Sequence, residues 1–203
     1  MTQSEHAPRI PGLLLAAGGG RRLGGRPKAL LSHRGRPLVE HAVQVLREGG
    51  CDPVYVVLGA AADQVRGQAE LAGCVLVDNP EWELGMGSSL RAGLHALTGA
   101  GPTAQAVVIS LVDQPGIGPT AIARVRAACR STASLAMATY AGRRGHPVLL
   151  GAEHWAGVAA SAVGDQGARA YLREHTPGIT LIECGDIADP GDIDTPADLT
   201  RLI

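Results

Sequence analysis

Short, unbroken apolar runs alternate along the chain with longer segments in which apolar residues recur at helical spacing. Four runs of strand length lie at Leu13–Ala17, Val54–Leu58, Cys74–Val77 and Ala106–Val112. Strands that are apolar without alternation are buried on both faces, which is typical of a parallel sheet covered by helices. Helices are expected from Pro37 to Gly49, over Ala61–Leu71, over the segment with Leu90, Leu94 and Leu97, and over Pro119–Cys129. The pattern predicts an α/β fold of three layers, α/β/α, with a mostly parallel sheet.

The last third of the chain departs from this alternation. Two strands, Leu135–Tyr140 and Val148–Leu150, are expected around a turn at Arg143–Gly145, which would be the one antiparallel element. A helix over Gly167–His175, a strand over Ile179–Glu183 and a terminal helix over Thr195–Leu202 follow. Because composition shows no linker-like break, we predict a flexible N-terminal tail at residues 1–10 and a single domain at residues 11–203.

Composition narrows the classes of function. Hydrophobic residues make up 45% of the 203 residues without any Phe, so the core must be built from Leu, Val, Ile and Ala. A net charge of −1 argues against general nucleic-acid binding. No apolar run approaches the roughly 18 residues of a membrane span, and the N-terminus resembles no secretory signal, so we expect a cytoplasmic protein without a membrane partner. The four cysteines form no C-x-x-C pair and are expected to be buried, reduced thiols.

The first apolar run ends in three glycines, Gly18–Gly20, followed by a basic loop. Its four cationic residues are Arg21, Arg22, Arg26 and Lys28. A buried strand that runs into such a loop presents backbone N–H groups and positive charge to a phosphate. Leu23 interrupts the dinucleotide fingerprint G-x-G-x-x-G, and Arg26-Pro27 replaces the Lys-Ser/Thr of a P-loop. We therefore expect an extended arm from which Lys28 reaches the phosphates; the alternative is a glycine-rich turn with solvated arginines.

Carboxylates for a metal ion are also available. Asp113 follows a buried strand at the sheet edge where open α/β sheets bind ligands. In the acidic cluster near the C-terminus, Asp194 is the residue best placed to face inward, although spacing favours an N-cap role for Asp194 or Thr195 about equally. Mg²⁺ is typically held by one or two carboxylates together with substrate phosphates.

The loop NPEWELGMGSSL precedes a helix for which Ser88 or Ser89 is a candidate N-cap. Met86 lies between two glycines and suggests a mobile flap. Trp82 and Trp155 could pack on a flat ligand, but simple core packing is the more common role for a tryptophan. His146, before Pro147, is a candidate ligand contact, although from the residues alone a satisfied polar residue in a turn is the more common role. Arg169, on a predicted helix, is a candidate anion contact, and a solvated helix arginine is nearly as common.

These segments, with LVDQP, GHPVLL, GDQGAR and DIDTPADL, occur in the order found in the molybdenum cofactor nucleotidyltransferases, and the chain resembles that family from residue 12 to 203. The likeness is strongest to its cytidylyl-transferring type, because LAAG and GMGSSL stand where guanylyl-transferring members have other loops. The resemblance implies a Rossmann-like fold of the nucleotide-diphospho-sugar-transferase type and a magnesium-dependent (or manganese-dependent) transfer of CMP from CTP to the phosphate of the molybdenum–molybdopterin cofactor, with release of pyrophosphate.

The resemblance also implies roles for individual residues. Nucleotide contacts would come from Ala16, Ala17, Gly18, Gly19, Gly20, Arg22, Lys28, Gly85, Met86, Gly87, Ser88 and Ser89. Catalysis would depend on Lys28, Arg22 and Asp113, and the metal would be held by Asp113 and Asp194. The acceptor would contact His146, Asp165 and Arg169.

Other functions remain open on the sequence. The enzyme could use GTP, or it could transfer a nucleotide to another phosphorylated acceptor. A non-enzymatic alternative is a delivery chaperone that hands the cofactor to a recipient molybdoenzyme or to its maturation chaperone. The presence of both Lys28 and Asp113 favours an enzyme.

Overall fold

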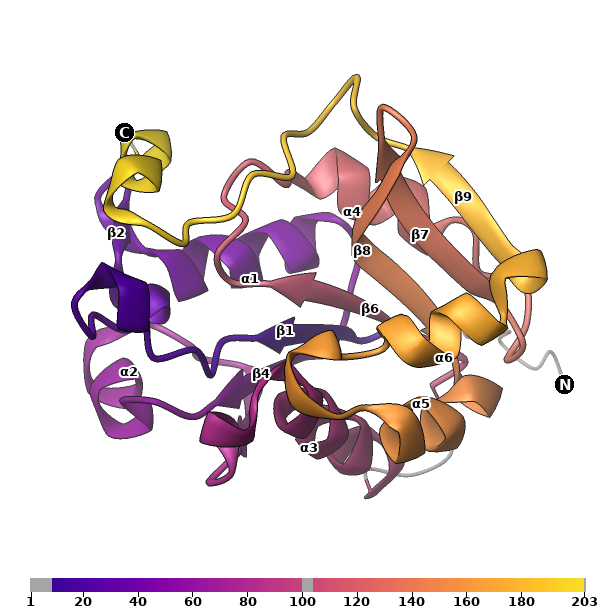
Figure 1. Ribbon diagram of the computed structural model, residues 1–203, viewed down its shortest axis with the longest axis horizontal. Helices are drawn as coiled ribbons and strands as arrows, with labels where there is room; N and C mark the ends of the chain where they lie inside the picture. Colours follow the sequence, from indigo (N-terminus) through magenta and orange to yellow (C-terminus); the bar gives the residue numbers. More distant parts are fainter. Residues whose placement is uncertain (1–8, 100–103, 203) are drawn as a thin grey trace, which may run out of the picture.

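A computed structural model describes residues 9–99 and 104–202, which form a seven-stranded sheet between two layers of helices (Figure 1). The strand order is β5-β4-β1-β6-β8-β7-β9. The strands are β1 (Gly12–Leu15), β4 (Val54–Leu58), β5 (Cys74–Asp78), β6 (Ala106–Leu111), β7 (Leu135–Tyr140), β8 (Arg143–Gly151) and β9 (Ile179–Glu183). All neighbouring strands are parallel except that β8 runs antiparallel to β6 and β7. The predicted α/β fold with a mostly parallel sheet and one antiparallel element is confirmed.

Helices cover both faces of the sheet. One face packs against α1 (Leu38–Glu48), α2 (Ala62–Gln68) and α4 (Pro119–Arg126), and the other against α3 (Met86–Gly99), α5 (Trp155–Ser161) and α6 (Arg169–Glu174). Successive residues of one strand enter opposite cores: Leu14 belongs to the first, Leu13 and Leu15 to the second. Because both faces are buried, the central strands β1 and β4 are apolar at every position, which is why the sequence shows unbroken runs there.

The remaining elements are short. A two-stranded ribbon consists of β2 (Ser32–His33) and β3 (Arg36–Pro37). The 3₁₀ turns are η1 (Arg21–Leu23), η2 (Lys28–Leu30), η3 (Trp82–Leu84), η4 (Ala152–His154), η5 (Gly164–Gln166), η6 (Thr176–Gly178) and η7 (Pro196–Leu202).

Several local predictions need correction. The turn between β7 and β8 lies at Ala141–Gly142, both with positive φ, so that Arg143–Gly145 belongs to β8. The helix α3 begins at Met86, which places Ser88 and Ser89 inside it rather than at its N-cap. These two errors concern element ends, where local propensity is weak and packing decides. The predicted terminal helix is present as the 3₁₀ helix η7, which begins at Pro196.

The predicted N-terminal tail falls mostly outside the described residues, which exclude positions 1–8. Arg9 forms a β-bridge with Ala104, and Ile10 is buried in the core, so these two residues already belong to the packed fold. All four cysteines are free thiols, but the predicted burial holds only for Cys51 and Cys184, whereas Cys74 and Cys129 are partly exposed. Among residues 9–99 and 104–202, no helix combines the length and the apolar character needed to cross a membrane.

Candidate active site

The basic loop after β1 is folded into two tight turns, η1 and η2, rather than the predicted extended arm. Gly20 is in the left-handed region at φ 60°, and its carbonyl accepts the N–H groups of Leu23 at 2.8 Å and Gly25 at 3.1 Å. A side chain at Gly20 would collide with the carbonyl of Arg26. Glycine is therefore required here, and the loop folds back so that Lys28 enters the site.

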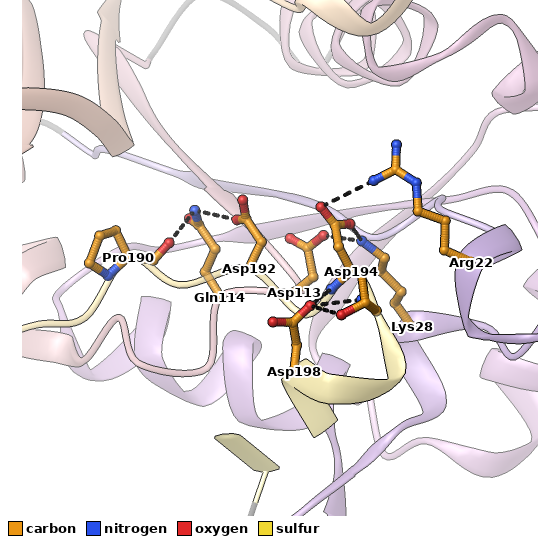
Figure 2. A network of polar contacts seen from close by, with 9 residues as sticks. Arg22, Lys28, Asp113, Gln114, Pro190, Asp192, Asp194 and Asp198 are labelled. Carbon is orange, nitrogen blue, oxygen red and sulfur yellow. Dashed lines mark hydrogen bonds and ion pairs between the residues drawn. The ribbon is translucent and has the colours of Figure 1, made fainter. Parts of the chain in front are cut away.

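Lys28 is at the centre of the site, between two carboxylates from distant parts of the chain (Figure 2). Its Nζ donates to Asp113 Oδ2 at 2.6 Å and to Asp194 Oδ1 at 2.5 Å. The side chains of Lys28 and Asp113 are 14% and 18% exposed, and that of Asp194 is 43% exposed. Burial lowers the pKa of Lys28, but the charges and hydrogen bonds of the two carboxylates outweigh it, so the pKa lies above its ordinary value. The ammonium group is thus charged at neutral pH.

The backbone fixes both carboxylates. Asp113 lies just beyond β6, and its carbonyl accepts the N–H of Ile193 at 2.8 Å, which ties the C-terminal segment to the end of the strand. Asp198 Oδ2 accepts the N–H groups of Asp194 at 3.2 Å and Thr195 at 2.7 Å. The Asp194 side chain accepts a hydrogen bond from Lys28 and, within the described residues, none from a backbone N–H, so the inward placement is confirmed over the N-cap role.

The role of Asp198 as a hydrogen-bond acceptor for this segment was not predicted, although its spacing from Thr195 indicates it. Thr195 and Asp198 have the Ser/Thr-x-x-Asp/Glu spacing that is typical of a helix start. Gln114 was also missed: its buried amide donates to Asp192 Oδ1 at 2.8 Å (Figure 2), and burial raises the pKa of Asp192. Asp192 therefore contacts Gln114, whereas Asp113 and Asp194 contact Lys28.

The arginines of the loop lie farther from this centre. Arg22 is 3.7 Å from Asp194 Oδ2 with its side chain 75% exposed, so it lies at the rim (Figure 2). Arg26 donates from Nε to the carbonyl of Leu23 at 3.3 Å, within the loop itself.

Lys28 is the only lysine of the chain; the other 17 of its 18 Lys and Arg residues are arginines. Its ammonium is a compact point charge with three donors, so it can donate to both carboxylates from one position.

The donor set fits a hard divalent cation. Two carboxylates that converge on one positive atom can also converge on Mg²⁺ or Mn²⁺, which complete their coordination with phosphate oxygens and water. In the described part of the chain, no group of three or more His, Cys, Asp or Glu side chains is arranged to hold a metal. Such a site suits a metal that enters with its nucleotide rather than one bound by protein ligands alone.

The segment Gly85–Ser89 splits into an accessible and a buried part. Ser88 and Ser89 are buried, and Asn79 Nδ2 donates to their hydroxyls at 2.9 and 3.0 Å. Their hydroxyl groups are thus bonded within the protein, whereas Gly85 and Met86 are partly exposed. Nucleotide contact by this segment stays a prediction, and the geometry favours Gly85 and Met86 over the serines.

The predicted nucleotide and acceptor segments touch one another. A Cβ built on Gly85 would lie 2.5 Å from Asp165 Oδ1 and 2.7 Å from the carbonyl carbon of Gly164. A Cβ on Gly167 would lie 3.2 Å from Met86 Sδ. The backbones of the two segments therefore pack directly together, and Asp165 lies against Gly85 where the two predicted segments meet.

His146 has an environment of its own on β8. Burial and the nearby charge of Arg169 lower the pKa of its imidazole to about 4. Its backbone carbonyl accepts the hydroxyl of Tyr140 at 2.7 Å. The imidazole is therefore neutral at neutral pH and can both donate and accept a hydrogen bond.

The chain resembles known proteins that carry different names. The family model described as "MobA-like NTP transferase domain" matches residues 12–179. The chain is 40% identical to a protein of Paenarthrobacter nicotinovorans named nicotine blue oxidoreductase, over 97% of both chains. It is 35% identical to a molybdenum cofactor guanylyltransferase of Bradyrhizobium sp. (strain ORS 278), over 72% of this chain and 67% of that one.

Solved structures agree with the fold. The crystal structure of a homologue of Mycobacterium tuberculosis rv0371c from Mycobacterium sp. strain JC1 superposes with a TM-score of 0.82 at 36% identity, over 96% of this chain and 94% of that one. The M. tuberculosis protein Rv0371c in complex with manganese superposes with a TM-score of 0.76 at 28% identity, over 96% and 97%.

Proposed function

Because the chain belongs to the MobA-like NTP transferase family, we propose that it is a divalent-metal-dependent nucleotidyltransferase that transfers a nucleoside monophosphate to the phosphate of the molybdenum–molybdopterin cofactor. The observation that supports this most is Lys28, held between Asp113 and Asp194 beside the glycine loop. LAAG and GMGSSL predict CTP as the donor, and the relatives named guanylyltransferase support GTP at least as well.

In the proposed reaction, a phosphate oxygen of the acceptor forms a bond to the α-phosphorus, and the bond from this phosphorus to the pyrophosphate oxygen breaks. A phosphate monoester has a second pKa of about 6 and is mostly dianionic at pH 7, so no protein base is required. Glycines 18–20, Arg22 and Lys28 would bind the triphosphate and stabilise charge on the leaving pyrophosphate. Asp113 and Asp194 would hold Mg²⁺ or Mn²⁺, which would supply further positive charge at the phosphates.

The acceptor would lie on the side of His146, Asp165 and Arg169. The neutral imidazole of His146 can bond a polar heterocycle, and Arg169 can contact the acceptor phosphate. A recipient molybdoenzyme or its maturation chaperone as a further partner, and a cytoplasmic location, stay predictions.

The direct test is pyrophosphate release from CTP, GTP and ATP, each with Mg²⁺ or Mn²⁺ and the molybdopterin cofactor. Asp113→Asn should lower turnover by at least about 100-fold, because it removes a charge that acts at the reacting phosphates. Asp189→Asn is a matched control, since Asp189 pairs with Arg201 at the surface, at 2.9 Å. Full activity of Asp113→Asn would refute the metal assignment. If pyrophosphate were released only with another phosphorylated acceptor, the molybdopterin cofactor would not be the substrate. If the protein bound the cofactor without releasing pyrophosphate, the delivery-chaperone alternative would be favoured.

A second function is supported by the 40% identity, over nearly the whole chain, to a protein named nicotine blue oxidoreductase. The interrupted G-x-G-x-x-G at Leu23 argues against a standard dinucleotide site. Following the absorbance of nicotine blue in the presence of NADH or NADPH separates the two functions. A change in nicotine blue absorbance would establish an oxidoreductase if the protein also releases no pyrophosphate in the nucleotidyltransferase assay.

A further inference from the structure

One aromatic side chain lies directly on the glycine loop of the site. A Cβ built on Gly19 would lie 3.0 Å from Cζ3 and 3.1 Å from Cη2 of Trp82. A Cβ on Gly59, immediately after β4, would lie 2.5 Å from Cβ and 2.8 Å from Cγ of the same residue. The indole therefore extends across the backbones of two loops at the carboxyl ends of β1 and β4, and it fits there because both positions are glycine.

The turn that carries Trp82 is fixed by buried polar groups. Asn79 Oδ1 accepts the N–H of Glu81 at 3.0 Å, and its amide donates to Ser88 and Ser89. The Ser88 hydroxyl lies 2.8 Å from the carbonyl oxygens of both Glu81 and Gly85 and donates its single proton to one of them. Buried polar groups are costly unless they are paired, so a fully bonded network of this kind confers rigidity. Here it fixes a turn whose flanking residues, Glu81 and Leu84, are exposed.

The other tryptophan shows what a purely structural role looks like. Trp155 is buried, 6% exposed, and its indole N–H donates to the carbonyl of Leu150 at 3.0 Å. Trp82 is only half-buried, and its N–H makes no hydrogen bond within residues 9–99 and 104–202. Trp82 thus combines a fixed position over the glycine loop with incomplete burial and an indole N–H that has no hydrogen-bond partner in the described residues.

We propose that Trp82 forms one wall of the nucleobase subsite, so that the base of the nucleotide held by the glycine loop and Lys28 packs on its indole. This inference rests on the proposed function. Stacking on an aromatic ring accepts every base, since each has a π face. Trp82 would therefore supply affinity for the base without selecting CTP over GTP, and selection would fall to groups that face the edge of the base.

The test measures equilibrium binding of CTP, GTP and inorganic tripolyphosphate, each with Mg²⁺. Tripolyphosphate has the phosphates without a base, so it reports the loop and Lys28 alone. Trp82→Ala should raise the Kd for CTP or GTP by about 10- to 100-fold, the range typical of one lost stacking contact, and should leave the Kd for tripolyphosphate within about twofold. Trp82→Phe, which keeps a ring, should restore most of the nucleotide affinity.

Fluorescence gives a second readout, because Trp82 and Trp155 are the two tryptophans of the chain. Nucleotide should change the emission of Trp155→Phe, in which Trp82 is the emitter, and leave that of Trp82→Phe unchanged. If Trp155→Phe does not fold, subtracting the emission of Trp82→Phe from that of wild type isolates the emission of Trp82.

Three outcomes would overturn the inference, and only one of them would also refute the proposed function. Equal weakening of nucleotide and tripolyphosphate by Trp82→Ala would mean that Trp82 only supports the loop. Unchanged nucleotide affinity would mean that the base lies elsewhere, with the proposed function intact. Failure of the wild-type protein to bind any of the three ligands would refute the proposed function and this inference together.

Discussion

Replacement of Lys28 by Ala removes the positive charge between Asp113 and Asp194 and leaves two carboxylates facing one another. Removing one partner of a fully buried ion pair costs about 3–5 kcal/mol. The side chains of Lys28 and Asp113 are mostly buried, but that of Asp194 is 43% exposed, so water screens part of the repulsion. We therefore expect the free energy of unfolding to fall by about 2 kcal/mol.

This magnitude can be followed by thermal unfolding. For a chain of this size, 1 kcal/mol shifts Tm by about 2–4 °C, so Lys28→Ala should unfold about 4–8 °C below wild type in EDTA. A divalent cation replaces the lost charge, so Mn²⁺ or Mg²⁺ should raise the Tm of Lys28→Ala more than that of wild type. Turnover should nevertheless stay at least about 100-fold below wild type, because the metal does not restore the cation at the phosphates.

Since Lys28 is the only lysine, [¹³C]lysine labelling gives a single side-chain ε signal, which should shift when Mg²⁺ and nucleotide bind. The matched control is Arg22→Ala, which removes an exposed cation at the rim of the site. It should lower the Tm by less than about 2–4 °C, the shift that corresponds to 1 kcal/mol. An unchanged Tm for Lys28→Ala, or equal metal stabilisation of variant and wild type, would refute the idea that Lys28 and metal share these carboxylates.

Two further predictions concern His146 and the contact between the nucleotide and acceptor segments. Because the folded pKa of His146, about 4, lies below the ordinary 6.5, the unfolded state binds the extra proton, and stability should fall by at most roughly 3 kcal/mol as the pH drops from 6.5 to 4. His146→Gln should lose this share of the pH dependence in urea unfolding, and an ordinary pKa for His146 by NMR titration would contradict the reasoning. Gly85→Ala should destabilise the fold by about 2–4 kcal/mol in the same assay, because φ is +97° and the new Cβ would overlap Asp165 and Gly164. Gly67→Ala, inside α2 with open space around it, is the control and should stabilise by about 0.5–1 kcal/mol; similar values for the two variants would refute the packing argument.

The strands and the loop could be predicted because their signals are local. A run such as Val54–Leu58 is apolar throughout since both of its faces are covered, and this property can be read from five consecutive residues. The three glycines before a cluster of cations likewise mark an anion site without knowledge of the rest of the chain. Element ends were less well predicted: the serines of GMGSSL have ordinary N-cap chemistry, yet a buried partner, Asn79, draws them into α3.

The sequence by itself therefore determined the class of fold, the candidate phosphate loop and the candidate carboxylates. Only the tertiary structure decided which of them meet: Lys28 lies 85 residues from Asp113 and 166 residues from Asp194, and the order of strands brings all three to one edge of the sheet. The position of Trp82 over Gly19 and Gly59 was decided in the same way. Spacing and periodicity report the neighbours of a residue along the chain, whereas a site depends on neighbours that packing and strand order create.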